Sequence, residues 1–213
     1  MCVETAAIAH LLEPFIKLDE SRLLSVSTYI DLLLKWNARI NLTAIREPDE
    51  IAQRHFGESL FAAKYLLENK HLQTATDLGS GAGFPGVPFA MLAPDVQVTL
   101  IEAQQKKATF LRELVRVLNL KNVKVFDQRA DSYPETADLV MLRAVEKFEE
   151  ALKMAMRLAK PGGSVAIMIG SGQVELARKL SSEVSWANPV QVPCSSSREL
   201  LVGVKLDKVE LNT

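Results

Sequence analysis

Residues 75–88 read Ala-Thr-Asp-Leu-Gly-Ser-Gly-Ala-Gly-Phe-Pro-Gly-Val-Pro, a pattern that predicts a short buried strand, a glycine-rich turn and the start of a helix. Gly79, Gly81 and Gly83 stand at alternate positions. Because glycine has no Cβ, the backbone there can fold tightly and approach a ligand closely. Pro85 suits a first helical turn, where its missing N–H would be unpaired anyway. A helix start directs unpaired N–H groups toward the turn, so the stretch predicts a ligand-binding site.

The residues around this turn leave two cofactor classes open. Counted from Gly81, the glycines match the Gly-x-Gly-x-x-Gly pattern of dinucleotide sites. Counted from Gly79, they form Asp-x-Gly-x-Gly-x-Gly, which is typical of class I S-adenosylmethionine-dependent methyltransferases. The carboxylate of Asp77 would repel a pyrophosphate but can orient a cationic amino-acid ligand. Glu102, at the end of the next expected strand, is placed to accept ribose hydroxyls in either class.

The composition predicts a water-soluble, cytoplasmic protein of one main domain. The chain has 213 residues, a net charge of -1 and ordinary hydrophobic and charged fractions. No apolar run approaches the roughly 20 residues of a membrane span, and the N-terminal residues do not resemble a secretory signal. Cys2 and Cys194 are isolated thiols, and no spacing predicts a metal site.

One part of the chain is locally basic. Residues 103–129 carry seven basic side chains against two acidic ones, Glu113 and Asp127. Such a cluster indicates either a solvated helix face or a footprint for phosphate groups. The seven basic residues are Lys106, Lys107, Arg112, Arg116, Lys121, Lys124 and Arg129.

Hydrophobic periodicity divides the chain into a helical extension at residues 1–70 and an α/β unit at residues 71–213. The first part has helical spacing, with a possible cap at Asp19 or Ser21. The second alternates strands and helices, which predicts a mostly parallel sheet of about seven strands with helices on both faces. After the strand at the glycine turn, strands are expected at residues 96–101, 123–126, 137–142, 164–169, 183–190 and 200–206.

The polar residues that follow the expected strands should meet at one edge of the sheet. In open α/β sheets, ligands bind beyond the carboxyl ends of the strands, where the strand order reverses. The groups in that position are Gly79–Phe84, Glu102, Ala130–Asp131 and Arg143. We therefore predict that they surround a single crevice.

From about residue 36 to residue 206 the chain resembles the glucose-inhibited division protein B family, which methylates N7 of a guanine in 16S ribosomal RNA. The glycine stretch, continued through Pro85-Gly86-x-Pro88, is the most specific part of the likeness. The other matching pieces are Trp36-Asn37-x-x-x-Asn41-Leu42-Thr43, Arg46, Arg54-His55 and Arg143-Ala144-Val145. The resemblance implies a class I methyltransferase with a Rossmann-like fold, S-adenosylmethionine as cofactor, and ribosomal RNA or a ribonucleoprotein as partner of a monomer.

The resemblance also implies roles for individual residues. The turn from Gly79 through Gly81 and Gly83 to Phe84 would hold the methionine and ribose side of the cofactor, and Glu102 the ribose hydroxyls. The remaining implied cofactor contacts are Ala130 and Asp131 at the adenine and Arg143 beside the target base. The implied RNA contacts are Asn41, Arg46, His55, Lys106 and Lys107. One position departs from the family: Ile169 stands where a lysine is usual, which bears on the substrate more than on the cofactor.

The implied reaction needs no proton transfer, because guanine N7 carries no proton, so we assign no catalytic acid, base or nucleophile. Alignment of the reactants can supply much of the rate enhancement. Two other functions stay open, a methyltransferase of another RNA site or a small molecule, and a nicotinamide-dependent oxidoreductase. Plainer roles are also open: Phe84 could only pack the helix start, His55 could be an ordinary helix residue, and Arg143 could pair with an acid such as Glu146.

Overall fold

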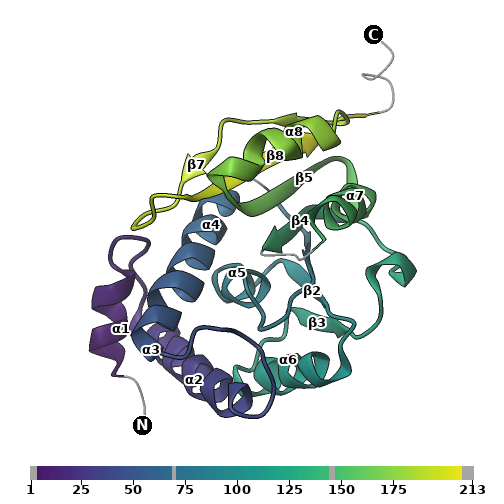
Figure 1. The fold of residues 1–213 in the computed structure, drawn as a ribbon. Helices are drawn as coiled ribbons and strands as arrows, with labels where there is room; N and C mark the ends of the chain where they lie inside the picture. The colour runs from purple at the N-terminus through teal and green to yellow at the C-terminus, as the bar shows by residue number, and fades with distance from the viewer. Residues whose placement is uncertain (1–3, 69–70, 144–146, 208–213) are drawn as a thin grey trace.

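The computed structural model describes residues 4–68, 71–143 and 147–207 (Figure 1). Within these ranges one sheet has eight strands, in the order β3-β2-β1-β4-β5-β8-β6, with β7 paired to β8. The strands are β1 (Thr74–Leu78), β2 (Gln97–Ile101), β3 (Val123–Phe126), β4 (Ala137–Arg143), β5 (Ala159–Gly170), β6 (Val184–Trp186), β7 (Val190–Gln191) and β8 (Arg198–Lys205). Strands β1 to β5 are parallel, and every pairing of β8 is antiparallel. The predicted α/β fold with a mostly parallel sheet is confirmed.

The strand expected at residues 183–190 is the one clear correction to the predicted elements. Two short strands replace it, because β6 ends at Trp186 and β7 begins at Val190. Asn188-Pro189 lies between them. Proline has no N–H to donate to a strand ladder, so the pairing stops there. Strand β5 is longer than expected, beginning at Ala159 rather than Ser164.

The helices of residues 71–207 alternate with the strands as expected, and those of residues 4–68 lie together on one side of the molecule (Figure 1). Helix α2 begins directly after Asp19, whose side chain accepts the Arg22 N–H at 2.8 Å, so Asp19 is the cap. The helical segments are α1 (Thr5–Leu12), α2 (Glu20–Asn37), α3 (Pro48–Glu50), the π-helix η1 (Ile51–Gly57), α4 (Glu58–Leu67), α5 (Gly86–Leu92), α6 (Gln105–Val117), η2 (Ala130–Ser132), α7 (Phe148–Leu158), η3 (Ser171–Gln173) and α8 (Val174–Leu180).

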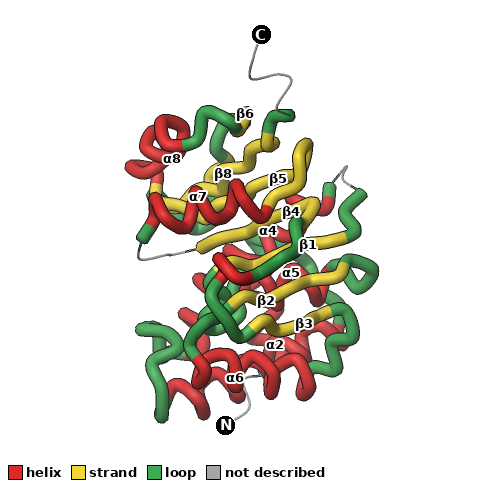
Figure 2. Tube along the Cα trace, turned by 90° about the vertical axis from the view of Figure 1, so that its right-hand side faces the viewer, coloured by secondary structure: helices red, strands yellow, loops and turns green. Residues whose placement is uncertain are grey.

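Two hydrophobic layers cover the two faces of the sheet. Alternate residues of a strand point to opposite faces. Leu139 and Met141 of β4 therefore join one layer, and Val140 and Leu142 the other. The first layer contains buried residues of α1, α2, η1, α4, α5 and α6, and the second those of α7 and α8. Figure 2 shows the sheet between them, running from β3 to β6.

Residues 4–68 contribute to the hydrophobic layer on one face of the sheet, the face that α5 and α6 also cover. Ile8 of α1, Tyr29 of α2 and Phe56 of η1 are fully buried together with Leu100 of β2. The division between residues 1–70 and 71–213 remains a prediction about domain organisation. No helix in the described ranges combines the length and the apolar character that crossing a bilayer requires.

Candidate active site

The glycine turn lies where the strand order reverses. Strand β1 is paired with β2 on one side and with β4 on the other. The chain therefore adds β2 and β3 on one side of β1, and then β4 and β5 on the other side. The register pairs Leu78 with both Ile101 and Leu142. Gly79 and Glu102, which follow β1 and β2, and Arg143, the last residue of β4, therefore lie at one edge of the sheet, which is where such folds bind ligands.

The turn uses backbone conformations that favour glycine. Gly79, Gly81 and Gly83 have φ of 71°, 56° and 93°. The N–H groups of Gly79 and Ser80 both donate to the Ile101 carbonyl at 3.0 Å, which fixes the start of the turn on β2. Gly79 is exposed and Gly81 half-buried, whereas Gly83 is buried. The first two glycines thus present their backbone outward, and the third packs inward.

Glu102 is held at the edge of the turn by backbone donors. Its Oε2 accepts the Gly81 N–H at 2.9 Å, and its Oε1 accepts the Gln104 N–H at 2.8 Å. The residue is only 7% exposed. Each carboxylate oxygen keeps a second lone pair, so the group is oriented and can still accept a hydrogen bond from a ligand hydroxyl.

Asp77 is a buried carboxyl group with one satisfied oxygen. Its Oδ2 accepts the N–H of Gly86, the first residue of α5, at 3.1 Å. Its Oδ1 is buried without a hydrogen-bond partner in the described residues. Burial raises the pKa of Asp77 to about 7, and the negative charge of Glu102 adds to the rise. The helix begins one residue after Pro85, and a side chain at Gly86 would lie 2.6 Å from Asp77.

An aromatic stack links the N-terminal helices to the turn. The Phe84 ring lies between Tyr29 of α2, with centroids 5.1 Å apart and planes 6° apart, and His55 of η1, at 4.8 Å and 23°. The Tyr29 hydroxyl donates to the Ala82 carbonyl at 2.5 Å. A Cβ on Gly83 would lie 2.4 Å from that hydroxyl. Phe84 therefore packs against the N-terminal helices, and its contact with the cofactor stays a prediction. Tyr29 is the residue that the sequence did not reveal, because there it is one apolar position of an ordinary amphipathic helix.

Arg143 is turned toward the N-terminal helices. Its guanidinium forms an ion pair with Glu58 at 2.8 Å and donates to the Arg54 carbonyl at 2.7 Å. It also donates to Ser59 Oγ at 3.2 Å. The side chains of Arg143 and Glu58 are 8% and 7% exposed. In the described residues the acid beside Arg143 is thus Glu58. The alternative partner Glu146 lies outside the described residues, as do Ala144 and Val145.

His55 is kept neutral by its surroundings. Its Nε2 is 2.8 Å from the Thr43 hydroxyl, in the loop that precedes α3. Burial lowers the pKa of His55 to about 3, and the positive charges of Arg143, Arg54 and Arg198 lower it further. An uncharged ring can hydrogen-bond or stack, but it cannot form an ion pair with a phosphate.

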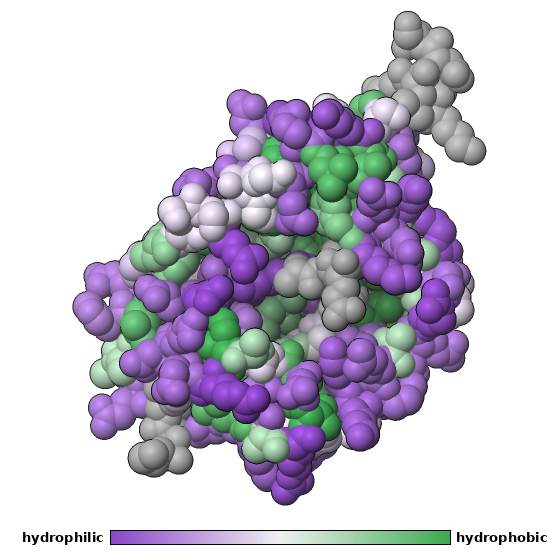
Figure 3. Space-filling model, in the orientation of Figure 1, coloured by the Kyte–Doolittle hydropathy of each residue, from purple (hydrophilic) through white to green (hydrophobic). Residues whose placement is uncertain are grey.

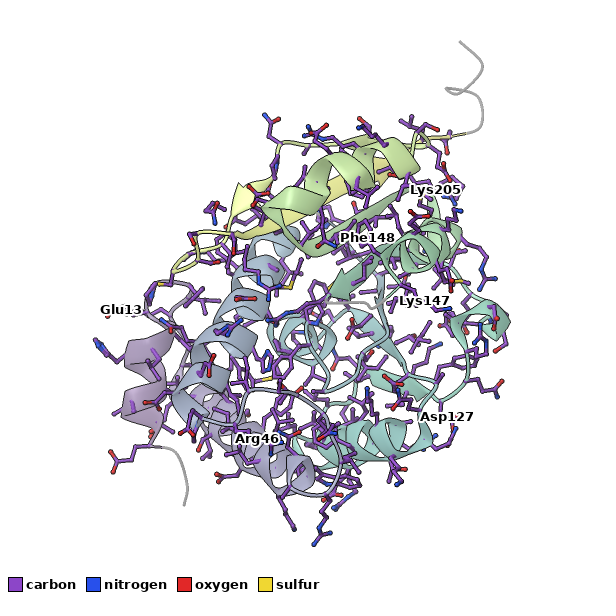
Figure 4. The ribbon with its side chains drawn as sticks, in the orientation of Figure 1. Glu13, Arg46, Asp127, Lys147, Phe148 and Lys205 are labelled. Carbon is purple, nitrogen blue, oxygen red and sulfur yellow. The ribbon has the colours of Figure 1, made fainter. Side chains whose placement is uncertain are left out.

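The other candidate residues are spread over three segments. Asn41 and Arg46 are exposed on the loop before α3, and Arg46 is labelled in Figure 4. Lys106 is exposed and Lys107 half-buried in the first turn of α6. Asp131 of η2 is exposed and pairs with the neighbouring Arg129 at 3.0 Å.

Two further positions named from the sequence are Ala130 and Ile169. The carbonyl of Ala130, also in η2, accepts a hydrogen bond from Arg157 of α7. Ile169 is 3% exposed and packs in the hydrophobic layer of α7 and α8. Seen from the side of Figure 1, hydrophilic residues cover most of the surface, and hydrophobic ones show near its middle (Figure 3).

Sequence comparison identifies the family. A family model described as rRNA small subunit methyltransferase G matches residues 22–201. The chain belongs to this family. Ribosomal RNA small subunit methyltransferase G of Xanthomonas campestris is 36% identical over 207 residues, which are 95% of each chain.

Solved structures show the same fold at much lower sequence identity. A proposed O-methyltransferase from Klebsiella pneumoniae aligns with a TM-score of 0.64 at 16% identity, covering 95% of this chain and 96% of that one. A SAM-dependent methyltransferase from Aquifex aeolicus gives a TM-score of 0.58 at 20% identity, covering 75% of this chain and 94% of that one. The class I methyltransferase fold predicted for this family member is therefore confirmed, and a nicotinamide-dependent oxidoreductase is set aside.

Proposed function

We propose that this chain transfers the methyl group of S-adenosylmethionine to N7 of a guanine in 16S ribosomal RNA. The observation that carries the proposal is the pair of buried carboxyl groups, Asp77 and Glu102, beside an outward-facing glycine turn at the point where the strand order reverses. Membership in the rRNA small subunit methyltransferase G family supports the RNA substrate. We further propose that the protein acts as a cytoplasmic monomer on this RNA or on a ribonucleoprotein that contains it.

The groups at the turn fit this cofactor better than a dinucleotide. Asp77 Oδ1 is a buried carboxyl oxygen without a hydrogen-bond partner among the described residues, and in its ionised form this carboxylate favours a cationic ligand and would repel a pyrophosphate. Glu102 is oriented to accept hydroxyl donors. When bound, S-adenosylmethionine supplies a methyl group on a positively charged sulfur. The residues proposed to hold it are Gly79, Gly81, Gly83, Phe84, Glu102, Ala130, Asp131 and Arg143.

The chain's own contribution is positional. Guanine N7 carries no proton, so none of the residues has to act as a base, which agrees with the low pKa of His55, a stacked ring that accepts a proton poorly. The stack of Phe84 between Tyr29 and His55 holds the turn against the N-terminal helices. Fixed alignment of this kind is what a displacement without proton transfer requires.

The proposed RNA contacts are those that the resemblance implies: Asn41, Arg46, His55, Lys106 and Lys107. Four of them lie on polar parts of the surface or close below it, and His55 would contribute by stacking or hydrogen bonding rather than by charge. A second candidate substrate, another RNA site or a small molecule, is favoured by one observation. Residue 169 is isoleucine rather than the usual lysine, and its side chain is buried among apolar side chains, so this position supplies no positive charge for RNA.

The test is methyl transfer from labelled S-adenosylmethionine to small-subunit RNA of a strain that lacks the protein, followed by nucleoside analysis. We expect label in 7-methylguanosine at one site. Naked RNA and assembled small subunits are assayed side by side, because either could be the substrate. Tight binding of S-adenosylhomocysteine with no transfer to either RNA form would refute the proposed substrate while leaving the cofactor site intact.

A further inference from the structure

A groove runs along the outer flank of the sheet, between the second half of α6 and the edge strand β3. It encloses a cavity of about 350 Å³. Its floor is apolar and half-buried, made by Val115, Leu120, Val123 and Val125. Pockets that hold small ligands have volumes of roughly 300–1,000 Å³, so the cavity has room for a single base or sugar rather than a folded helix.

The rim of the groove carries positive charge that the described acidic residues do not neutralise. Arg112 is paired with Asp127, which follows β3 (Figure 4). Arg116 and Lys121 line the same cavity, and neither forms an ion pair with a described carboxylate. Glu113, the acid on the same helix, is hydrogen-bonded to Trp36 at 3.1 Å. Two cations are therefore left at the groove.

The neighbouring charges on β3 face the other way. Lys124 pairs with Glu135 at 2.7 Å and lies 5.5 Å from the centre of the Tyr133 ring, on the face opposite to α6. Strand β3 is paired with β2 alone among the described strands, so its other edge is open. The groove thus combines a strand edge without a second described partner strand, an apolar floor and two cations without an ion-pair partner among the described residues.

We propose that this groove is a second RNA-binding site, which holds a single-stranded segment of the substrate away from the reacting guanine. An unstacked base or ribose would cover the apolar floor, and Arg116 and Lys121 would contact the flanking phosphates. Proteins that bind single-stranded nucleic acid commonly combine a basic groove with aromatic side chains on which the bases stack. In this groove the aliphatic floor would take the place of the aromatic side chains. A peptide partner would leave the two cations without counter-charges unless it were acidic.

The position of the groove fits an RNA that also reaches the glycine turn. Helix α6 begins at Gln105, three residues after Glu102, and runs away from the turn toward the groove. In Figure 1, α6 and β3 lie at one end of the molecule, and β8 and α8 at the other. Lys106 and Lys107, in the first turn of α6, would then lie between the two sites. The inference rests on the proposed function, since it assigns a further contact to the same RNA.

The test compares RNA binding by two double variants at several salt concentrations. Arg116→Ala with Lys121→Ala removes the two groove cations. Lys153→Ala with Lys179→Ala removes the same charge from exposed positions of α7 and α8, on the opposite face of the sheet. The probe is a labelled small-subunit RNA transcript, and S-adenosylhomocysteine binding is measured on each protein.

For the groove variant we expect RNA affinity to fall about tenfold or more near 0.1 M salt. The plot of log affinity against log salt has a negative slope, and the steepness of this slope should fall by roughly 1.5, the value for two lost phosphate contacts. S-adenosylhomocysteine affinity should not change, and the control variant should bind RNA like the wild type. Equal RNA binding by the groove variant and the wild type, or an equal loss in both double variants, would overturn the proposal.

The failure of this proposal and of the proposed function are separable. Methyl transfer by the wild type to the same transcript is measured in parallel. Transfer to guanine N7 together with unchanged binding by the groove variant would reject only the groove. If the groove variant bound assembled subunits more weakly than the wild type but bound the naked transcript equally well, the groove would be assigned to a protein partner. That result would also reject it as an RNA site.

Discussion

Tyr29→Phe tests whether the N-terminal helices set the shape of the cofactor turn. The change keeps the ring that stacks on Phe84 and removes only the hydroxyl that donates to the Ala82 carbonyl at 2.5 Å. Ala82 is 8% exposed, so its carbonyl is left without this donor in a nearly dry environment. Leaving a buried acceptor unsatisfied costs about 1–3 kcal/mol. We expect the free energy of unfolding in urea to fall by that amount.

The same change should weaken cofactor binding, because the turn that presents Gly81 becomes less well ordered. A loss of about 1.4 kcal/mol at the turn corresponds to a tenfold rise in the dissociation constant. We expect about this rise for S-adenosylhomocysteine, measured by calorimetry. Val26→Ala, a buried position of the same helix, is the control, with a roughly similar loss of stability and unchanged ligand binding. Equal ligand affinity in Tyr29→Phe and the wild type would refute the reasoning.

Three further predictions concern groups beside the turn. Arg143→Met leaves Glu58 buried and unpaired, so the free energy of unfolding should fall by about 3–5 kcal/mol; addition of Glu58→Leu should recover most of it, and a loss below about 1 kcal/mol would show that the pair is not needed. For Asp77 the folded pKa of about 7 lies above the ordinary value, so the wild type should lose roughly 4 kcal/mol as pH rises from about 4 to above 7. Asp77→Asn removes this decline, and parallel stability curves of the two proteins from pH 4 to 8 would contradict it. Gly83→Ala, with a φ of 93° and a Cβ 2.4 Å from the Tyr29 hydroxyl, should cost about 3 kcal/mol in thermal or urea denaturation. If the double variant with Tyr29→Phe were as stable as Tyr29→Phe alone, backbone strain would have no part in that cost.

Much of the fold could be predicted because its signals are local. The apolar run that becomes β2, the glycines between β1 and α5, and the Asp19 cap of α2 each act within a few residues of sequence. The alternation of strands and helices then implies a parallel sheet, whose carboxyl edge collects the residues after each strand. The split at Asn188-Pro189 is not evident from the sequence, because Val184, Trp186 and Val190 on its two sides keep the even spacing of a single strand.

The candidate site is predictable only in part, because only some of its residues are fixed by local signals. The sequence by itself determined the glycine turn and the carboxylates near the ends of β1 and β2, Asp77 and Glu102, since these depend on position relative to a strand end. Only the tertiary structure decided which side chains hold the turn. Tyr29 meets Ala82 across 53 residues, and Arg143 meets Glu58 across 85. Contacts between segments so far apart depend on how the helices pack on the sheet, and no local pattern in either segment encodes that packing.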